Sequence, residues 1–150
     1  MFINLPRSKS MIENDRQPTP DSPVYEKIRS RMNNRLGAVY SALYSFLSAR
    51  QIARHQRDAN TIILHAQNTQ IVCRNDSTRS PAELLDLLLP NGPNGGNAFD
   101  LALKAADRAI STYDTRPPVI IFLSDGIASV SDSVVRTLFR NTAQKGCVFK

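Results

Sequence analysis

Four oxygen-bearing side chains are the strongest candidates for chemistry in this sequence. Ser8 and Ser10 lie two residues apart in PRSKSM, so an extended chain would point both hydroxyls the same way. Asp125 directly follows the apolar run VIIFLS, and Asn97 follows a glycine pair. Hard cations such as Mg²⁺ and Ca²⁺ prefer hydroxyl, amide and carboxylate oxygens. These four residues, the candidate metal ligands, therefore predict a divalent-metal site.

Plainer roles for the same residues stay open. Asp125 and the glycine after it would also form an ordinary solvated turn. The hydroxyls of Ser8 and Ser10 would also cap their own loop, and Arg7 and Lys9 would then be a solvated pair of charges. In these interpretations the residues bind no metal.

Alternating strands and helices have to position the candidate ligands. The apolar runs predict strands at 2–5, 61–66, 69–74 and 119–124, with a further strand beginning at 147. Helix periodicity and capping residues predict helices at 34–55, 81–89, 97–113 and 131–144, and a polar, proline-bearing loop at about 6–32. This order predicts one α/β domain of three layers, with a mostly parallel sheet covered by helices on both faces.

Details of these elements give sharper expectations. Only two residues, Gln67 and Asn68, join the second and third strands, which requires an antiparallel hairpin. The run 119–124 is apolar enough to be a fully buried strand. The long helix has one apolar face, made by Leu36, Val39, Tyr40, Leu43, Phe46 and Leu47. In such a sheet the loops after the first and fourth strands lie side by side, which would bring the candidate ligands together.

The pieces PRSKSM, GGNAFDLAL and IIFLSDG, in this order and joined by these elements, resemble a von Willebrand factor type A (vWA) domain. The stretch NNRLGAVYSALYSFLSAR and the DRQPTP loop before it resemble a group of fungal proteins that carry this domain. The resemblance covers nearly the whole chain, 1–150. It implies a Rossmann-like vWA fold with strand order 3-2-1-4-5-6, in an incomplete domain whose C-terminal strand and helix are missing.

The resemblance also implies a metal site with a defect. The family's metal-ion-dependent adhesion site has D-x-S-x-S after the first strand, Thr after a glycine pair, and Asp before Gly after the fourth strand. Both serines and Asp125 keep these residue types, but Asn97 replaces the Thr and Pro6 replaces the first Asp. Because proline has no side-chain oxygen, we expect Mg²⁺ to bind weakly or not at all. Glu13 or Asp15, just after Ser10, would be the substitutes for the missing carboxylate.

Three functions fit these features. The resemblance implies a non-enzymatic protein-interaction module, in which an acidic side chain of a protein partner completes the metal's coordination at the strand tips. The alternatives are a metal-free scaffold domain and a nucleotide- or phosphate-binding enzyme that uses the Gly-rich loop 92–96. We favour the first, because neither G-x-G-x-x-G nor G-x-x-x-x-G-K-[ST] occurs in the sequence.

Composition narrows the partners and the location. The net charge is +6, and residues 1–60 hold ten Lys and Arg against five Asp and Glu. Nucleic acid is nevertheless an unfavoured partner, since aromatic residues make up 7% and tryptophan is absent. Apolar runs of four to five residues fall short of the roughly 20 that a membrane span needs, and MFINLPRSKS lacks a secretory leader. We therefore expect an intracellular, cytoplasmic protein that does not bind membranes.

The histidines and cysteines suggest no further chemistry. His65 falls among apolar strand residues and is expected to be packed rather than part of a catalytic triad with Ser8 and Asp125. His55, near a helix C-terminus, is expected to be structural. The two cysteines, Cys73 and Cys147, lack metal-ligand spacing and are expected to be small buried residues.

Overall fold

The computed structural model describes residues 1–53, 58–112, 118–124, 130–144 and 148–149. The strands are β1 (Phe2–Pro6), β2 (Asn60–His65), β3 (Thr69–Asp76), β4 (Val119–Phe122) and β5 (Val148–Phe149). The helices are the short 3-10 helix η1 (Lys9–Ile12) and the α-helices α1 (Tyr25–Arg29), α2 (Arg35–Ile52), α3 (Pro81–Leu88), α4 (Phe99–Ser111) and α5 (Asp132–Ala143).

The described strands form one mostly parallel sheet. Their order is β3-β2-β1-β4-β5, so the first strand lies in the centre. β1 runs parallel to both β2 and β4, and β4 runs parallel to β5. Among the described strands only β2 and β3 pair antiparallel, as their two-residue connection requires. The predicted hairpin, strand order and mostly parallel sheet are thus confirmed.

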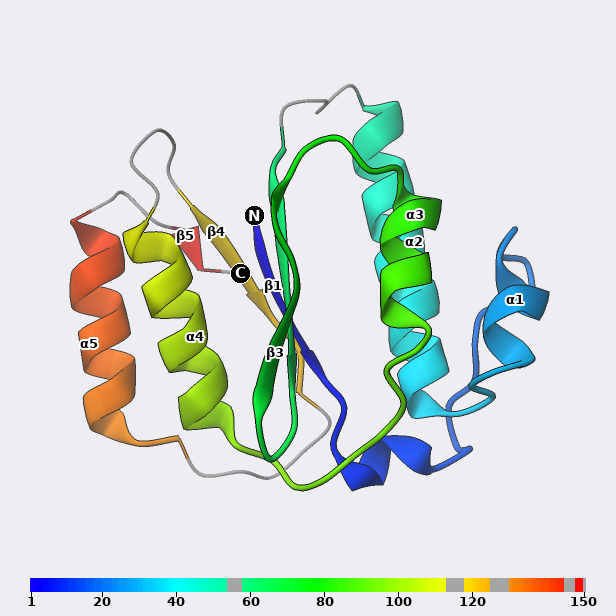
Figure 1. The fold of residues 1–150 in the computed structure, drawn as a ribbon, viewed down its shortest axis with the longest axis horizontal. Helices are drawn as coiled ribbons and strands as arrows, with labels where there is room; N and C mark the ends of the chain where they lie inside the picture. The colour runs from blue at the N-terminus through cyan, green and yellow to red at the C-terminus, as the bar shows by residue number, and fades with distance from the viewer. Residues whose placement is uncertain (54–57, 113–117, 125–129, 145–147, 150) are drawn as a thin grey trace.

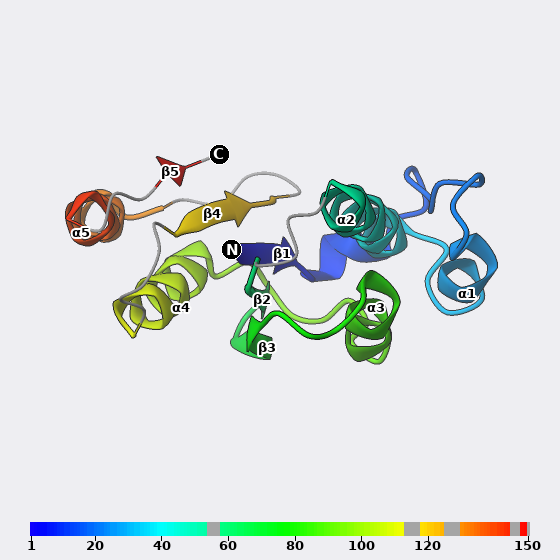
Figure 2. The same cartoon turned by 90° about the horizontal axis from the view of Figure 1, so that it is seen from above.

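Helices cover both faces of this sheet (Figures 1 and 2). Side chains alternate along β1, so Ile3 and Leu5 face the opposite side from Phe2. Ile3 and Leu5 pack into the larger core cluster, which includes residues of α1, α2 and α3. Phe2 packs with residues of α4 and α5 in a second cluster. The predicted three-layer α/β architecture is therefore confirmed.

The segment 6–32 contains more structure than the polar loop predicted from the sequence. It forms η1 and α1, and four of its apolar residues, Met11, Val24, Ile28 and Met32, are buried in the larger core cluster. Met11 is isolated in the sequence, so η1 had no periodic signal, but Val24, Ile28 and Met32 have the four-residue spacing of one helix face, which was not used to predict α1. The segment packs against α2 and belongs to the core of the fold.

The long helix α2 begins where the sequence predicts, because the Asn34 side chain accepts a hydrogen bond from the Gly37 backbone N–H at 3.1 Å. Its buried stripe contains Leu36, Tyr40, Leu43 and Leu47. The expectation that Phe46 belongs to the buried face was wrong, because its side chain lies at the margin of this stripe. Phe46 is 37% exposed, and the Arg50 guanidinium carbon lies 5.8 Å from its ring centre.

Two further boundaries differ from expectation. The helix after the Gly-rich loop was predicted to open at Asn97, but α4 starts at Phe99, because the Ala98 N–H bonds to the Ala66 carbonyl and holds the chain out of helical geometry. The fourth strand was predicted to be fully buried, but in β4 only Ile120 is. Ile120 packs in the cluster that includes residues of α4, and its strand neighbours are less well covered.

Candidate functional site

Three loop segments meet at the C-terminal end of β1, the lower end of the sheet in Figure 1. The Arg7 N–H donates to the His65 carbonyl at 2.8 Å, and the Arg7 carbonyl accepts from the Asn94 N–H at 2.6 Å. The Lys9 N–H donates to the Gly95 carbonyl at 2.8 Å. We call segments 7–10, 65–68 and 94–98 the strand-tip loops. They lie where open α/β sheets place their ligand sites.

Gly95 allows this close approach. Its φ of +68° is a conformation that residues with a side chain rarely adopt. A Cβ atom at this position would also lie 2.9 Å from the Cβ of Gln67 in the neighbouring strand-tip loop. The glycine therefore joins two of the strand-tip loops, a role that the sequence motif alone did not indicate.

Ser8 and Ser10 point toward each other. Their hydroxyl oxygens lie 2.8 Å apart, within hydrogen-bond distance. Ser8 is only 3% exposed, whereas Ser10 is exposed. Ser8 precedes η1, but its side chain does not cap that helix. The two hydroxyl oxygens thus lie together, and the bond between them also fits the plainer role in which they cap their own loop.

Of the other two candidate ligands, the structure describes Asn97 but not Asp125. Asn97 belongs to the strand-tip loop 94–98, which backbone hydrogen bonds tie to residues 7–9 and to Ala66. Asp125 lies outside the described residues. Convergence of all four candidate ligands therefore stays a prediction.

The donor set formed by Ser8, Ser10 and Asn97 is uncharged. Pro6 is buried in β1 and contributes no side-chain oxygen. Both carboxylate oxygens of Asp15 accept hydrogen bonds from Arg35, at 2.5 and 2.8 Å, which lowers the pKa of Asp15. Asp15 is thus engaged in an ion pair with Arg35, and the substitution of the missing carboxylate by Asp15 or Glu13 stays a prediction.

Among the described residues, no three His, Cys, Asp or Glu side chains lie together in a way that could hold a metal ion. A divalent cation needs carboxylates to offset its charge. The described residues at the strand tips therefore do not by themselves fit a tightly bound Mg²⁺.

His65 is fully buried between two aromatic rings. It stacks on Phe122 with ring centres 5.1 Å apart and meets the edge of Phe99 at 5.5 Å. Its Nε2 atom lies 3.3 Å from the Leu123 carbonyl oxygen. The expectation of a packed histidine is confirmed. His55 and Cys147 lie outside the described residues, while Cys73 is buried as expected.

The Gly-rich loop before α4 was the candidate phosphate site of the enzyme alternative. Phosphate sites of this kind use free backbone N–H groups at a helix N-terminus. Here the N–H groups of Asn94 and Ala98 already donate to carbonyls of Arg7 and Ala66. These two groups are therefore not free to bind phosphate, and the nucleotide-binding alternative stays a prediction.

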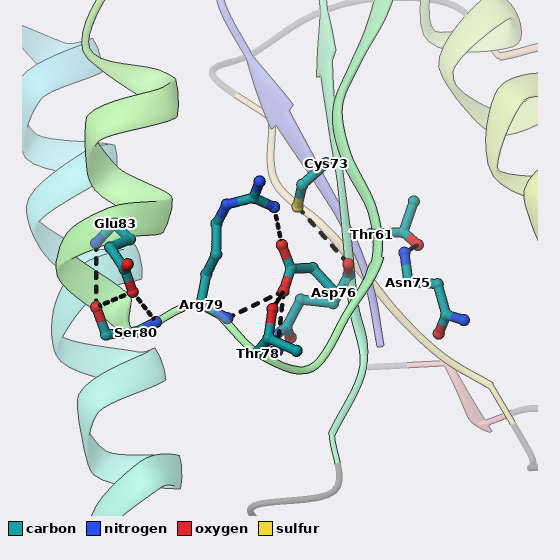
Figure 3. Close-up of polar contacts among 9 residues, drawn as sticks. Thr61, Cys73, Asn75, Asp76, Thr78, Arg79, Ser80 and Glu83 are labelled. Carbon is teal, nitrogen blue, oxygen red and sulfur yellow. Dashed lines mark hydrogen bonds and ion pairs between the residues drawn. The ribbon is translucent and has the colours of Figure 1, made fainter.

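A buried carboxylate that sequence reasoning missed organises the opposite end of the sheet (Figure 3). Asp76 accepts hydrogen bonds from the Thr78 N–H and hydroxyl and from the Arg79 N–H, and it pairs with the Arg79 guanidinium. Burial by itself raises the pKa of Asp76, but these bonds outweigh burial and lower the pKa to about 2. Asp76 thus fixes the turn between β3 and α3.

A cavity of about 330 Å³ lies beside this turn. Met1, Asn60, Thr78 and two arginines are among its lining residues. Both arginines are paired, Arg50 with Asp58 and Arg79 with Asp76. Because its charges are already neutralised and it lies away from the strand-tip loops, we assign it no ligand.

The sequence matches no protein-family model, and no curated protein matches it. Solved structures do match. The VWA domain of SpRpn10 is 11% identical, with a TM-score of 0.67, over 99% of this chain and 70% of that one. BatB from Bacteroides thetaiotaomicron is 20% identical, with a TM-score of 0.65, over 99% of this chain and 63% of that one.

The chain has the vWA fold. A third similar structure, proximal thread matrix protein 1 from mussel byssus, is 9% identical, with a TM-score of 0.60, over 99% of this chain and 35% of that one. This chain therefore spans about two thirds or less of the length of BatB and of the byssus protein. At these identities the likeness concerns the fold alone, and the fungal resemblance stays a prediction.

None of the helices in the described part of the chain is long and apolar enough to cross a membrane.

Proposed function

We propose that this vWA-fold domain is a non-enzymatic protein-interaction module that binds its partner at the strand-tip loops. The supporting observation is the set of backbone hydrogen bonds that joins residues 7–9 to the loop 94–98 and to the end of β2. Loops held on a rigid sheet in this way are pre-organised, which lowers the entropy lost on binding. The vWA fold itself suggests an interaction or adhesion role.

The exposed residues of these loops are polar. Lys9, Ser10, Asn94 and Gly96 are exposed. They offer charge and hydrogen bonds to a partner, and a binding role needs no bond to be made or broken.

We further propose that binding needs little or no Mg²⁺. Pro6 stands where the resemblance expects a carboxylate, and Asp15 is engaged by Arg35. A metal bound through the hydroxyls, Asn97 and Asp125 alone would lack a second negative charge and so be held weakly.

Site-specific photo-crosslinking in living cells tests the proposed location. A photoreactive residue replaces Asn94, whose side chain is exposed at the strand tips, and in a matched control it replaces Ser77, exposed at the opposite end. We expect one discrete protein adduct from position 94 and none from position 77. The captured protein, once purified, should bind the chain at a stoichiometry of one to one.

Equal adducts from both positions, or an adduct from position 77 alone, would place the interaction elsewhere. No adduct from either position, with the chain folded and expressed, would contradict the interaction role at this site.

A further inference from the structure

The Arg7 side chain is the charge at the strand tips that the fold does not explain. Its Nε atom is buried and has no hydrogen-bond partner. The ion pairs among the described residues involve Lys27, Arg29, Arg35, Arg50 and Arg79 but neither Arg7 nor Lys9. A buried donor without a partner costs free energy, so a group that pairs with this side chain would stabilise it.

Arg7 belongs to the side of the sheet that α2 covers. Alternation along the chain places it on the same face as Leu5, which packs in the core cluster with α2. Burial raises the pKa of the Tyr40 hydroxyl well above its usual range, and the positive charge of Arg7 opposes this rise. The Tyr40 hydroxyl itself donates at 2.9 Å to the Asn91 carbonyl in the connection between α3 and α4.

We propose that Arg7 binds a carboxylate side chain of the partner protein at the strand-tip loops. Although its Nε is buried, Arg7 as a whole is partly exposed, and a planar guanidinium recognises a carboxylate through two parallel hydrogen bonds. Lys9, exposed two residues further on, adds a second positive charge. The Ser8 and Ser10 hydroxyls beside them supply neutral donors.

This inference rests on the proposed function and names the chemistry of the partner. In the vWA resemblance a metal ion would meet the partner's acidic group. Here the guanidinium would carry that role without a metal, because the chain has proline where the first metal-binding carboxylate would stand.

Nuclear magnetic resonance of the ¹⁵N-labelled chain in EDTA tests the proposal directly. The probes are the blocked tripeptides acetyl-Gly-Asp-Gly-amide and acetyl-Gly-Asn-Gly-amide, with inorganic phosphate as a third. We expect the Arg7 Nε–H signal to move saturably with the Asp peptide and to stay in place with the Asn peptide. In Arg7→Gln the nearby Lys9 and Gly95 amide signals should no longer respond.

Arg74→Gln is the matched control. Arg74 is exposed on β3, so this substitution removes the same charge away from the strand tips. It should keep the full response to the Asp peptide. Arg7→Lys, which keeps the charge but loses the planar fork, guards against a folding artefact and should respond more weakly than the original chain. Amide dispersion should be the same in all variants.

Three results would overturn the role of Arg7. They are an equal response to the Asn peptide, a retained response in Arg7→Gln, and a response to phosphate without one to the Asp peptide.

The captured partner separates this inference from the proposed function. We expect Arg7→Gln to weaken its binding by about tenfold to a hundredfold in EDTA, as the loss of one charge-assisted contact predicts. Unchanged affinity would refute the inference and leave the interaction role standing. A peptide response without any protein partner at the strand tips would refute the interaction role instead.

Discussion

Among single side chains, Asp76 makes a large contribution to the stability of one end of the sheet. Its carboxylate is 4% exposed and joins the end of β3 to the start of α3 through Thr78 and Arg79. The adjacent capping box of Ser80 and Glu83 then begins α3. Together these contacts fix a connection that contains only four residues, 77–80.

Asp76→Asn should destabilise the chain in a pH-dependent way. The pKa of the Asp76 carboxyl is about 2 when folded against 3.8 in its ordinary state, so the ionised form favours folding. This contribution, about 2 kcal/mol, is fully present above pH of about 4 and is lost as the pH falls toward about 2. Urea unfolding should show the variant less stable by that amount near neutral pH, with the difference shrinking in acid.

Asp86→Asn is the control for this experiment. Asp86 pairs with Lys27 on the surface, where both side chains are about half exposed. Its loss should cost less than about 1 kcal/mol. A deficit of Asp76→Asn that persists unchanged near pH 2 would mean that charge is not the source of its effect.

At the scale of elements, α2 depends on close contact between its first turn and the segment before it. A Cβ atom on Gly37 would lie 1.9 Å from the Met32 carbonyl oxygen and 3.1 Å from the Cγ of Pro18. Backbone cannot move aside as a flexible side chain does, so the helix and the segment 18–32 must separate if this position carries a side chain.

Gly37→Ala should therefore lower the free energy of unfolding by about 2–3 kcal/mol, although alanine is the better helix former. Gly92→Ala is the matched control, because nothing lies within 4 Å of its Cβ position. Urea unfolding curves of the two variants measure the difference. Equal stability, or a gain for Gly37→Ala, would show that the packing at Met32 is looser than described.

Elements with strong local signals could be predicted from the sequence, and those held by distant contacts could not. Ser80 and Pro81 predicted the start of α3, and the two-residue connection predicted the hairpin of β2 and β3. By contrast, η1 exists because the isolated Met11 reaches the core, while α1 had a signal, the four-residue spacing of Val24, Ile28 and Met32, that was not used to predict it. The Ser8 and Ser10 pair followed from spacing, but the buried Nε of Arg7 depends on the surrounding chain.

At the scale of the whole molecule, a weak metal site predicts that metal ions do little to stabilise the fold. An ion that binds only the folded state raises its stability as the ion concentration increases. The unmodified chain should show little or no rise in melting temperature with Mg²⁺ or Mn²⁺. Pro6→Asp combined with Asn97→Thr should show a clear rise, because a second carboxylate then offsets the charge of the ion.

Adding Asp125→Ala to the double variant should abolish that rise. A rise in the original chain that Asp125→Ala removes would mean that another residue supplies the missing carboxylate. A flat response in the double variant would favour the metal-free scaffold.

Hydrogen–deuterium exchange of the chain, alone and with its captured partner, tests most directly whether the strand tips bind a protein. Binding at the strand-tip loops and binding at the opposite end of the sheet would protect different segments. We predict that the partner slows exchange in segments 7–10, 65–68 and 94–98 and leaves residues 76–80 unchanged. Protection of residues 76–80 and Asn60, beside the cavity at the opposite end, with unchanged exchange at the strand tips would contradict the proposed function.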